Sequence, residues 1–120
     1  MKKILIVDDS PFIAMELKDI VTSEGYEVVG HARSGEEGIK KYGELRPDIV
    51  TIDIIMPGID GIETARRIRA LYPEAAIVML SSMCDEDTMN ELEEAGLKYI
   101  VEKPIDEKLL IEALREVAVS

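Results

Sequence analysis

Five short runs of apolar residues, rich in valine and isoleucine, constrain the fold of this chain more than any other feature. They occupy residues 3–7, 27–31, 48–52, 76–80 and 99–101. Most are almost continuously apolar rather than alternating with polar residues, which is typical of strands buried on both faces. Both faces of a sheet are buried when parallel strands alternate with helices. The runs therefore predict a parallel β-sheet between two layers of helices.

A segment with helical spacing follows each of the five runs. The first places Ile13, Leu17, Ile20 and Val21 on one face and ends near Gly25. The other four begin at or near residues that can cap a helix: Ser34, Asp60, Asp85 and Asp106. With right-handed crossovers this order gives an α/β, doubly wound, flavodoxin-like (βα)5 fold. We expect the strand order 2-1-3-4-5, which is common for five parallel strands.

Length and charge limit what such a chain can do. At 120 residues it has the size of one domain, so we expect a single unit over residues 1–120. Its net charge of −11 argues against binding to nucleic acid or to an anionic membrane, because both require a basic surface. No apolar run approaches the roughly 20 residues of a transmembrane helix. Cys84 is the only cysteine, which excludes an internal disulfide and favours a reduced, cytoplasmic location.

Acidic residues follow two strands that are predicted to be neighbours. Asp8 and Asp9 come after the first strand, and Asp53 comes after the third. Neighbouring strands lie about 4.8 Å apart, so the three carboxylates should meet at the edge of the sheet where ligands bind. Two carboxylates about 4 Å apart repel by roughly 4 kcal/mol at an effective dielectric constant near 20. Three need a proton, a basic partner or a cation, and an all-oxygen site suits Mg²⁺ better than zinc.

Two further polar side chains are predicted at the same edge. Ser81 follows the fourth strand and Lys103 follows the fifth. An ammonium group, a hydroxyl and backbone N–H groups can together hold a tetrahedral anion. Asp53, central in the sheet, is then the candidate nucleophile, because a carboxylate that attacks phosphorus gives an acyl phosphate. The alternative, that the acids are solvated loop residues or helix caps, explains one acid better than three.

Four motifs resemble those of the response-regulator receiver domain of two-component signalling. They are ILIVDDS at residues 4–10, DIIMPGIDG at 53–61, MLSS at 79–82 and KP at 103–104. Each motif alone is a weak signal, but all four occur in the family's order at the ends of predicted strands. The resemblance covers essentially the whole chain, whose size is similar to that of the CheY-like, single-domain members.

The resemblance implies roles for the acidic residues. Asp53 matches the phosphoacceptor, and the donor would be a phosphohistidine on a sensor histidine kinase or a histidine phosphotransfer protein. Asp9, Asp53 and the backbone carbonyl of Ile55 match direct ligands of Mg²⁺, with Mn²⁺ as an alternative ion. Asp8 matches an acid that holds the ion through water. The cognate kinase is not specified by the sequence.

The resemblance also implies a conformational switch. Ser81 matches the hydroxyl that moves towards the phosphoryl group, and Lys103 matches the family's site lysine, followed by a cis bond to Pro104. Helix 4, strand 5 and helix 5 would form the surface that binds an unknown downstream protein. Receivers usually place an inward-swinging aromatic residue where this chain has Ile100. Tyr99 comes one residue earlier and should face the other side of the strand, so we predict activation without an aromatic swing.

Two apolar side chains are predicted to control how long the phosphoryl group survives. Ile55 lies two residues after Asp53, and Met83 lies two residues after Ser81. In the resembling family these positions flank the phosphoryl group. Bulky apolar groups should exclude the hydrolytic water, and a tenfold slowing needs only about 1.4 kcal/mol. The alternative is that both are ordinary loop residues without influence.

Other residues leave alternatives open. Phe12 and Met15 lie off the main apolar stripe of the first helix, and fit either a kinase-docking surface or additional core. For His31, an exposed or locally bonded histidine is favoured over a metal-binding or phosphorelay role. An inert thiol is favoured for Cys84. The acidic run that begins at Asp85 fits a solvated helix N-terminus better than a target for a basic partner.

The favoured function is a phosphorylation-dependent switch, which catalyses only its own phosphoryl uptake and hydrolysis. A metal-dependent phosphatase with a small substrate is the second hypothesis, but no Asp-x-Asp motif follows the first strand. A third is a receiver-shaped module that accepts no phosphate, which the intact acids, Ser81 and Lys103 argue against. No glycine-rich nucleotide-binding loop occurs. We expect a monomer, with dimerisation on phosphorylation as an open alternative.

Overall fold

The structure, a computed structural model, describes residues 1–82 and 85–119. Five parallel strands form a sheet in the order β2-β1-β3-β4-β5, which confirms the predicted flavodoxin-like fold. The strands are β1 (Lys3–Val7), β2 (Glu27–Ala32), β3 (Ile49–Asp53), β4 (Ile77–Ser81) and β5 (Ile100–Glu102). The helices are α1 (Pro11–Ser23), α2 (Gly35–Leu45), α3 (Gly61–Leu71), α4 (Glu86–Glu94) and α5 (Glu107–Val119).

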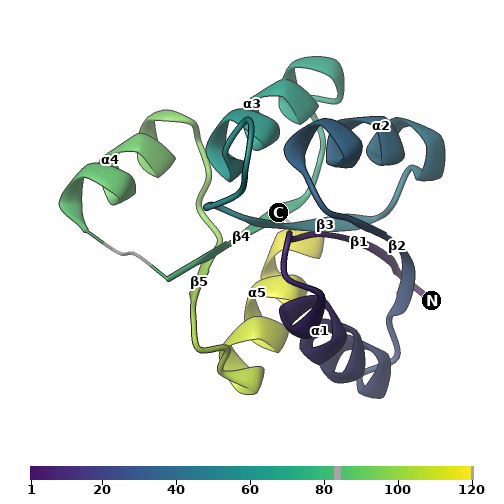
Figure 1. Cartoon of the computed structure of the whole chain (residues 1–120). Coiled ribbons are helices and arrows are strands. Elements are labelled where there is room, and N and C mark those ends of the chain that lie inside the picture. Colours follow the sequence, from purple (N-terminus) through teal and green to yellow (C-terminus); the bar gives the residue numbers. More distant parts are fainter. Residues whose placement is uncertain (83–84, 120) are drawn as a thin grey trace.

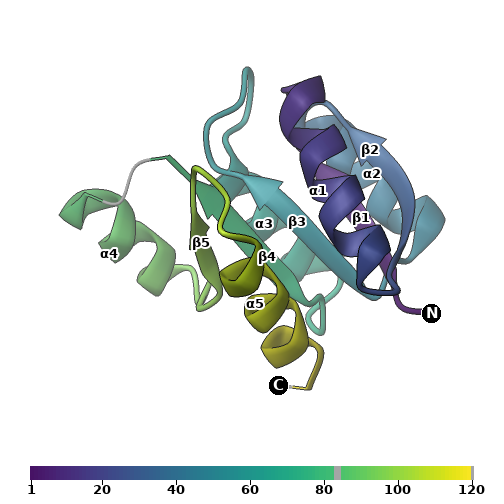
Figure 2. The same ribbon diagram turned by 90° about the horizontal axis from the view of Figure 1, so that it is seen from below.

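Helices cover both faces of the sheet. α2, α3 and α4 lie on one face and α1 and α5 on the other (Figures 1 and 2). The strands divide their side chains between two cores: Leu5 and Val7 pack on the α2–α3 side, and Ile4 and Ile6 pack on the α1–α5 side. Because both faces are buried, the strand sequences read as continuous apolar runs.

The last three strands extend one residue further than the apolar runs predicted. Asp53, Ser81 and Glu102 are polar, yet each is the final residue of its strand. Strand pairing is made by backbone groups, so a polar residue can continue the pairing after the apolar run has ended. This correction matters because Asp53 and Ser81 are predicted site residues, and both are held on the sheet rather than in loops.

Side chains cap the helices where the sequence indicated. The backbone N–H groups that donate to these caps belong to Glu37, Glu63, Thr88 and Leu109, and the accepting caps are Ser34, Asp60, Asp85 and Asp106. Ser10, which the sequence pattern did not single out, caps α1 in the same way. The buried face of α1 is centred on Ala14, Leu17 and Val21, while Ile13 and Ile20 lie at its margin. No helix in the described ranges has the length and apolar character needed to cross a membrane.

The edge strand β2 contains an irregularity that sets the position of its carboxyl end. Ile4 pairs with Val28 and Leu5 pairs with Gly30, so Val29 has no partner and forms a β-bulge. After the bulge, Ile6 pairs with His31. The end of β2 therefore lies beside the residue that follows β1, which is Asp8.

Candidate functional site

Three carboxylates converge at the carboxyl end of the sheet, as the strand order predicts. Asp8 and Asp9 directly follow β1, and Asp53 ends the adjacent strand β3. One oxygen atom from each side chain lies within 4.8 Å of the other two. Asp8 is fully buried, Asp53 is nearly so, and Asp9 is exposed. The site thus has two acids in its floor and one at its mouth.

Lys103 reaches this group of acids from the end of β5. Its Nζ lies 3.1 Å from Oδ1 of Asp53 and 3.3 Å from Oδ2 of Asp8. Among the described salt bridges, Lys103 is the only cation that contacts these acids. Its backbone N–H donates to the carbonyl of Ser81 at 2.8 Å, and its peptide bond to Pro104 is cis. One ammonium group cannot balance three ionised carboxylates, so the site retains an excess of negative charge.

The electrostatic environment of Asp53 reflects this excess. Burial raises the pKa of Asp53 above its ordinary value, and the nearby charges of Asp8 and Asp9 add to the rise. The ammonium of Lys103 lowers the pKa but does not cancel the effect of burial. A divalent cation would relieve the repulsion between the carboxylates. Three carboxylates without a histidine or cysteine are the donor set that suits Mg²⁺ or Mn²⁺.

Asp8 is fixed through its backbone as well as its side chain. Its N–H donates to the carbonyl of Ala32 at 2.9 Å, and its Oδ1 accepts from the N–H of Ser10 at 2.8 Å. Its carbonyl lies 2.7 Å from Nε2 of His31. The sequence favoured an exposed or locally bonded histidine. His31 is half-buried, and its bond reaches from β2 to the residue that follows the adjacent strand β1. The sequence signal that could have identified His31 as a neighbour of the acidic site is its position near the end of the strand that pairs with β1.

Gly61 allows the first turn of α3 to lie directly against the strand that carries Asp53. A Cβ atom at this position would overlap the carbonyl oxygen of Asp53, far inside van der Waals contact. The N–H of Gly61 donates to the carbonyl of Ile54 at 2.7 Å. The backbone after Asp53 is therefore held close to the helix, and only glycine fits there without a shift. The motif at residues 53–61 contains this glycine, but the sequence does not reveal the contact.

The residues predicted to control hydrolysis and switching occupy distinct places. Ile55 is 53% exposed and lies between the buried residues Ile54 and Met56. Ser81 is buried at the end of β4. The predictions for Met83 and Cys84 concern positions outside the described residues.

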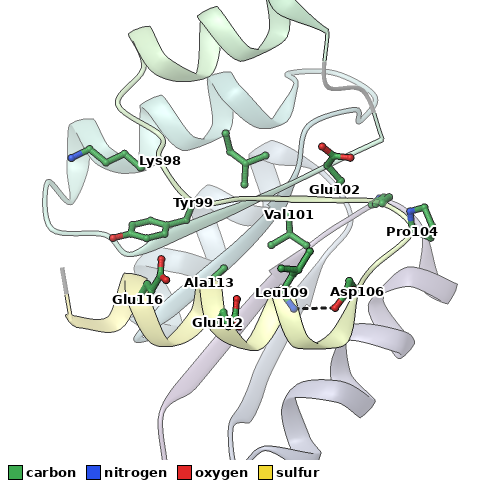
Figure 3. Close-up of a pocket in the computed structure, with 12 residues that line it drawn as sticks. Lys98, Tyr99, Val101, Glu102, Pro104, Asp106, Leu109, Glu112, Ala113 and Glu116 are labelled. Carbon is green, nitrogen blue, oxygen red and sulfur yellow. Dashed lines mark hydrogen bonds between the residues drawn. The ribbon is translucent and has the colours of Figure 1, made fainter.

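Ile100, the first residue of β5, and Tyr99, the residue before it, face opposite sides of the sheet, as predicted. Ile100 packs against the core on the α2–α3 side, whereas Tyr99 packs against the core on the α1–α5 side. In Figure 3 the ring of Tyr99 extends along α5, near Ala113 and Glu116. The position that the family usually gives to an aromatic residue therefore holds an aliphatic one in contact with a packed core.

The outer face of α1 carries two large apolar side chains. Phe12 is 79% exposed and Met15 is 63% exposed. Of the two alternatives that the sequence left open, this exposure rules out additional core. Both residues lie near the start of the helix that follows Asp8 and Asp9, so they form an apolar surface beside the acidic site.

Comparison with known proteins agrees with this geometry. The model of the response regulator receiver domain family matches residues 4–115. The chain belongs to this family. It is 44% identical over 117 residues to the chemotaxis protein CheY of Thermotoga maritima, with 98% of each chain covered. It is 39% identical over 114 residues to CheY of Bacillus subtilis, with 95% of each covered.

Solved structures also resemble this receiver domain. The crystal structure of the CheX-CheY-BeF3-Mg²⁺ complex from Borrelia burgdorferi contains a chain that superposes with a TM-score of 0.93. That chain is 35% identical in sequence, and the match covers 99% of this chain and 90% of that one. The response regulator domain of Thermotoga maritima CheB superposes with a TM-score of 0.91 at 34% identity, covering 100% of this chain and 98% of that one. The chain is a CheY-like receiver domain of two-component signalling.

Proposed function

We propose that this receiver accepts a phosphoryl group on Asp53 from a phosphohistidine of a sensor histidine kinase or a histidine phosphotransfer protein. The observation that supports this proposal is the convergence of Asp8, Asp9 and Asp53, with Nζ of Lys103 within 3.3 Å of two of them. Burial raises the pKa of Asp53, and a more basic carboxylate is a better nucleophile. Residues 1–120 would act as one phosphoacceptor unit.

In the proposed reaction, an oxygen of Asp53 attacks phosphorus as the bond between phosphorus and the donor histidine breaks. The leaving imidazole keeps the electron pair of that bond and then takes a proton from water. Lys103 and Ser81 would hold the phosphoryl oxygens by an ammonium group and a hydroxyl. Asp9, Asp53 and the backbone carbonyl of Ile55 would hold Mg²⁺ or Mn²⁺, with Asp8 acting through water. The ion would supply positive charge that stabilises the transferring phosphoryl group.

We further propose that the surface formed by α4, β5 and α5 binds the downstream protein. A groove runs along β5 and α5, and its lining includes Tyr99, Leu109 and Ala113 (Figure 3). Ser81 is tied to the end of β5 because its carbonyl accepts the backbone N–H of Lys103. A movement of Ser81 towards the phosphoryl group would therefore reach this surface through the backbone. Because Ile100 takes the family's aromatic position, this route needs no aromatic swing.

The chain would thus serve as a cytoplasmic, monomeric switch rather than as an enzyme that acts on a separate substrate. Its catalysis would be limited to its own phosphorylation and dephosphorylation. Dimerisation on phosphorylation is the alternative, and light scattering of the protein with and without a phosphate mimic distinguishes the two.

Incubation with acetyl phosphate and Mg²⁺, followed by intact mass measurement, tests the proposed phosphorylation. The wild-type protein should gain one phosphoryl group, and Asp53→Asn should gain none. Asp9→Ala should lose both the dependence on Mg²⁺ and most of the uptake, because the exposed ligand is removed. Asp19→Asn, an exposed acid on α1, is the matched control and should behave as wild type. Undiminished uptake by Asp53→Asn would overturn the assignment.

A further inference from the structure

We infer that His31 is a positioning residue of the acidic site. Its imidazole fixes the peptide that joins Asp8 to Asp9 and so orients the carboxylates that would bind the divalent cation. This inference rests on the proposed binding of Mg²⁺ by the same acids. It assigns a function to a residue of the edge strand β2, which contributes no side chain to the carboxylate cluster itself.

The contact between His31 and Asp8 is short and has a defined polarity. Nε2 of His31 lies 2.7 Å from the carbonyl oxygen of Asp8, within the range of a strong hydrogen bond. A carbonyl oxygen can only accept, so Nε2 carries the proton and donates. The contact therefore specifies the tautomer of His31. Asp8 is fully buried, which makes the imidazole a partner that bulk water cannot easily replace.

The carbonyl of Asp8 and the amide nitrogen of Asp9 belong to one planar peptide group. A hydrogen bond that holds this carbonyl therefore also sets the direction in which the chain enters Asp9. The other polar groups of Asp8 are already held, since its N–H donates to Ala32 and its carboxylate contacts Ser10 and Lys103. In the described part of the chain the carboxylate of Asp9 has no hydrogen bond, so its direction depends on the backbone that His31 restrains.

His31 is itself held by a side chain from α2. Nζ of Lys41 donates to the carbonyl of His31 at 2.8 Å and lies 3.8 Å from Oε1 of Glu37. The same Oε1 accepts the backbone N–H of Arg33 at 2.8 Å. These contacts hold the chain at the carbonyl of His31 and at Arg33, just after the end of β2. The imidazole is thus carried by a restrained strand end, which is what a positioning residue requires.

Titration of backbone amide signals with Mg²⁺ by NMR tests the inference on the intact protein. His31→Ala should weaken Mg²⁺ binding about tenfold, a loss that is common when a group supporting a metal ligand is removed. His31→Gln places an amide N–H at a similar reach and should restore the affinity to within about twofold of wild type. Val28→Ala, which changes a half-buried apolar residue of the same strand that pairs regularly with Ile4, is the control and should leave the affinity unchanged.

A second measurement does not depend on any variant. The ¹⁵N signals of the imidazole in the wild-type protein should show the Nε2–H tautomer of His31, and the Nδ1–H tautomer would overturn the inference. Equal Mg²⁺ affinity in His31→Ala and wild type, together with weaker binding in Asp9→Ala, would overturn the role of His31 alone. Absence of Mg²⁺ binding in the wild-type protein would overturn the proposed metal site as well.

Discussion

Asp53 combines burial with negative charge, and these two properties oppose each other in the free energy of folding. An ionised carboxylate loses hydration when it is buried, and Asp8 and Asp9 add repulsion. The ammonium of Lys103, 3.1 Å from Oδ1 of Asp53, offsets part of this destabilisation. Because the net effect is a raised pKa, the folded protein binds a proton on Asp53 more tightly than the unfolded chain does. The ionised carboxylate of Asp53 is therefore held at some cost to stability.

Replacing Asp53 with asparagine should raise the free energy of unfolding at pH 7 by on the order of 1 kcal/mol, the scale of many single substitutions. Because the pKa of Asp53 is higher in the folded protein than in the unfolded chain, protonation of Asp53 favours folding. This stabilisation is complete below pH 3.8, the ordinary pKa of the group, and is lost as the pH rises through the higher pKa of the folded protein. The difference in the free energy of unfolding between Asp53→Asn and wild type should therefore become smaller towards acid pH. Urea denaturation at a series of pH values measures it, and a less stable Asp53→Asn at pH 7 would contradict the prediction.

Ile55 follows Asp53 by two residues, and we predict that its side chain limits the approach of the water that hydrolyses the acyl phosphate. The residue is 53% exposed and belongs to neither core cluster, so its side chain is available to act on access to Asp53. Ile55→Asn should hasten the loss of phosphate about tenfold, which corresponds to roughly 1.4 kcal/mol of barrier. Ile55→Val keeps an apolar group and should decay at nearly the wild-type rate.

Intact mass measured at intervals after removal of the phosphodonor, with Mg²⁺ present, follows this decay. Met83→Glu offers an independent variant at the second predicted position. If phosphate is lost at an unchanged or slower rate in both Ile55→Asn and Met83→Glu, these side chains do not control access of water.

The elements of secondary structure were predictable because the central strands β1, β3 and β4 are buried on both faces and the edge strands β2 and β5 are partly buried. Burial selects continuous apolar sequence, and capping residues mark four of the five helix starts. The ends of β3, β4 and β5 were less predictable, because Asp53, Ser81 and Glu102 extend the strands by backbone pairing alone. The pattern of apolar residues in a sequence indicates which side chains are buried. It indicates backbone pairing only indirectly.

The same distinction applies to the elements that build the site. Asp8, Asp53 and Lys103 could be placed together because the strand order determines which strand ends meet. His31 and Gly61 could not, because they act on backbone atoms of the acidic residues. His31 contacts the carbonyl of Asp8, and Gly61 makes room for the carbonyl of Asp53. Which carbonyl a side chain reaches depends on strand register, including the bulge in β2, rather than on residue type.

Over the whole molecule, the excess of acidic residues and the excess charge in the site act in the same direction. The chain carries a net charge of −11, and the carboxyl edge of its sheet holds three carboxylates against one ammonium group. Cations in general should therefore stabilise the fold by screening. A cation bound between the carboxylates should do so much more strongly, because it relieves the repulsion at Asp53 directly. Screening by cations in general and binding of one cation between the carboxylates differ in the concentration of ion that each requires.

Addition of Mg²⁺ should raise the stability of the folded protein in a manner that depends on the three acids. A ligand that binds only the native state stabilises it by about 2.7 kcal/mol at one hundred times its dissociation constant. For a chain of this size such a gain corresponds to a rise in Tm on the order of 10 °C. Thermal unfolding in MgCl₂, compared with NaCl at equal ionic strength, separates specific binding from screening. Asp9→Ala should retain only the rise seen in NaCl, whereas Asp19→Asn should respond as wild type does. An equal rise in Tm for wild type in both salts would show that the acidic cluster holds no specific divalent cation.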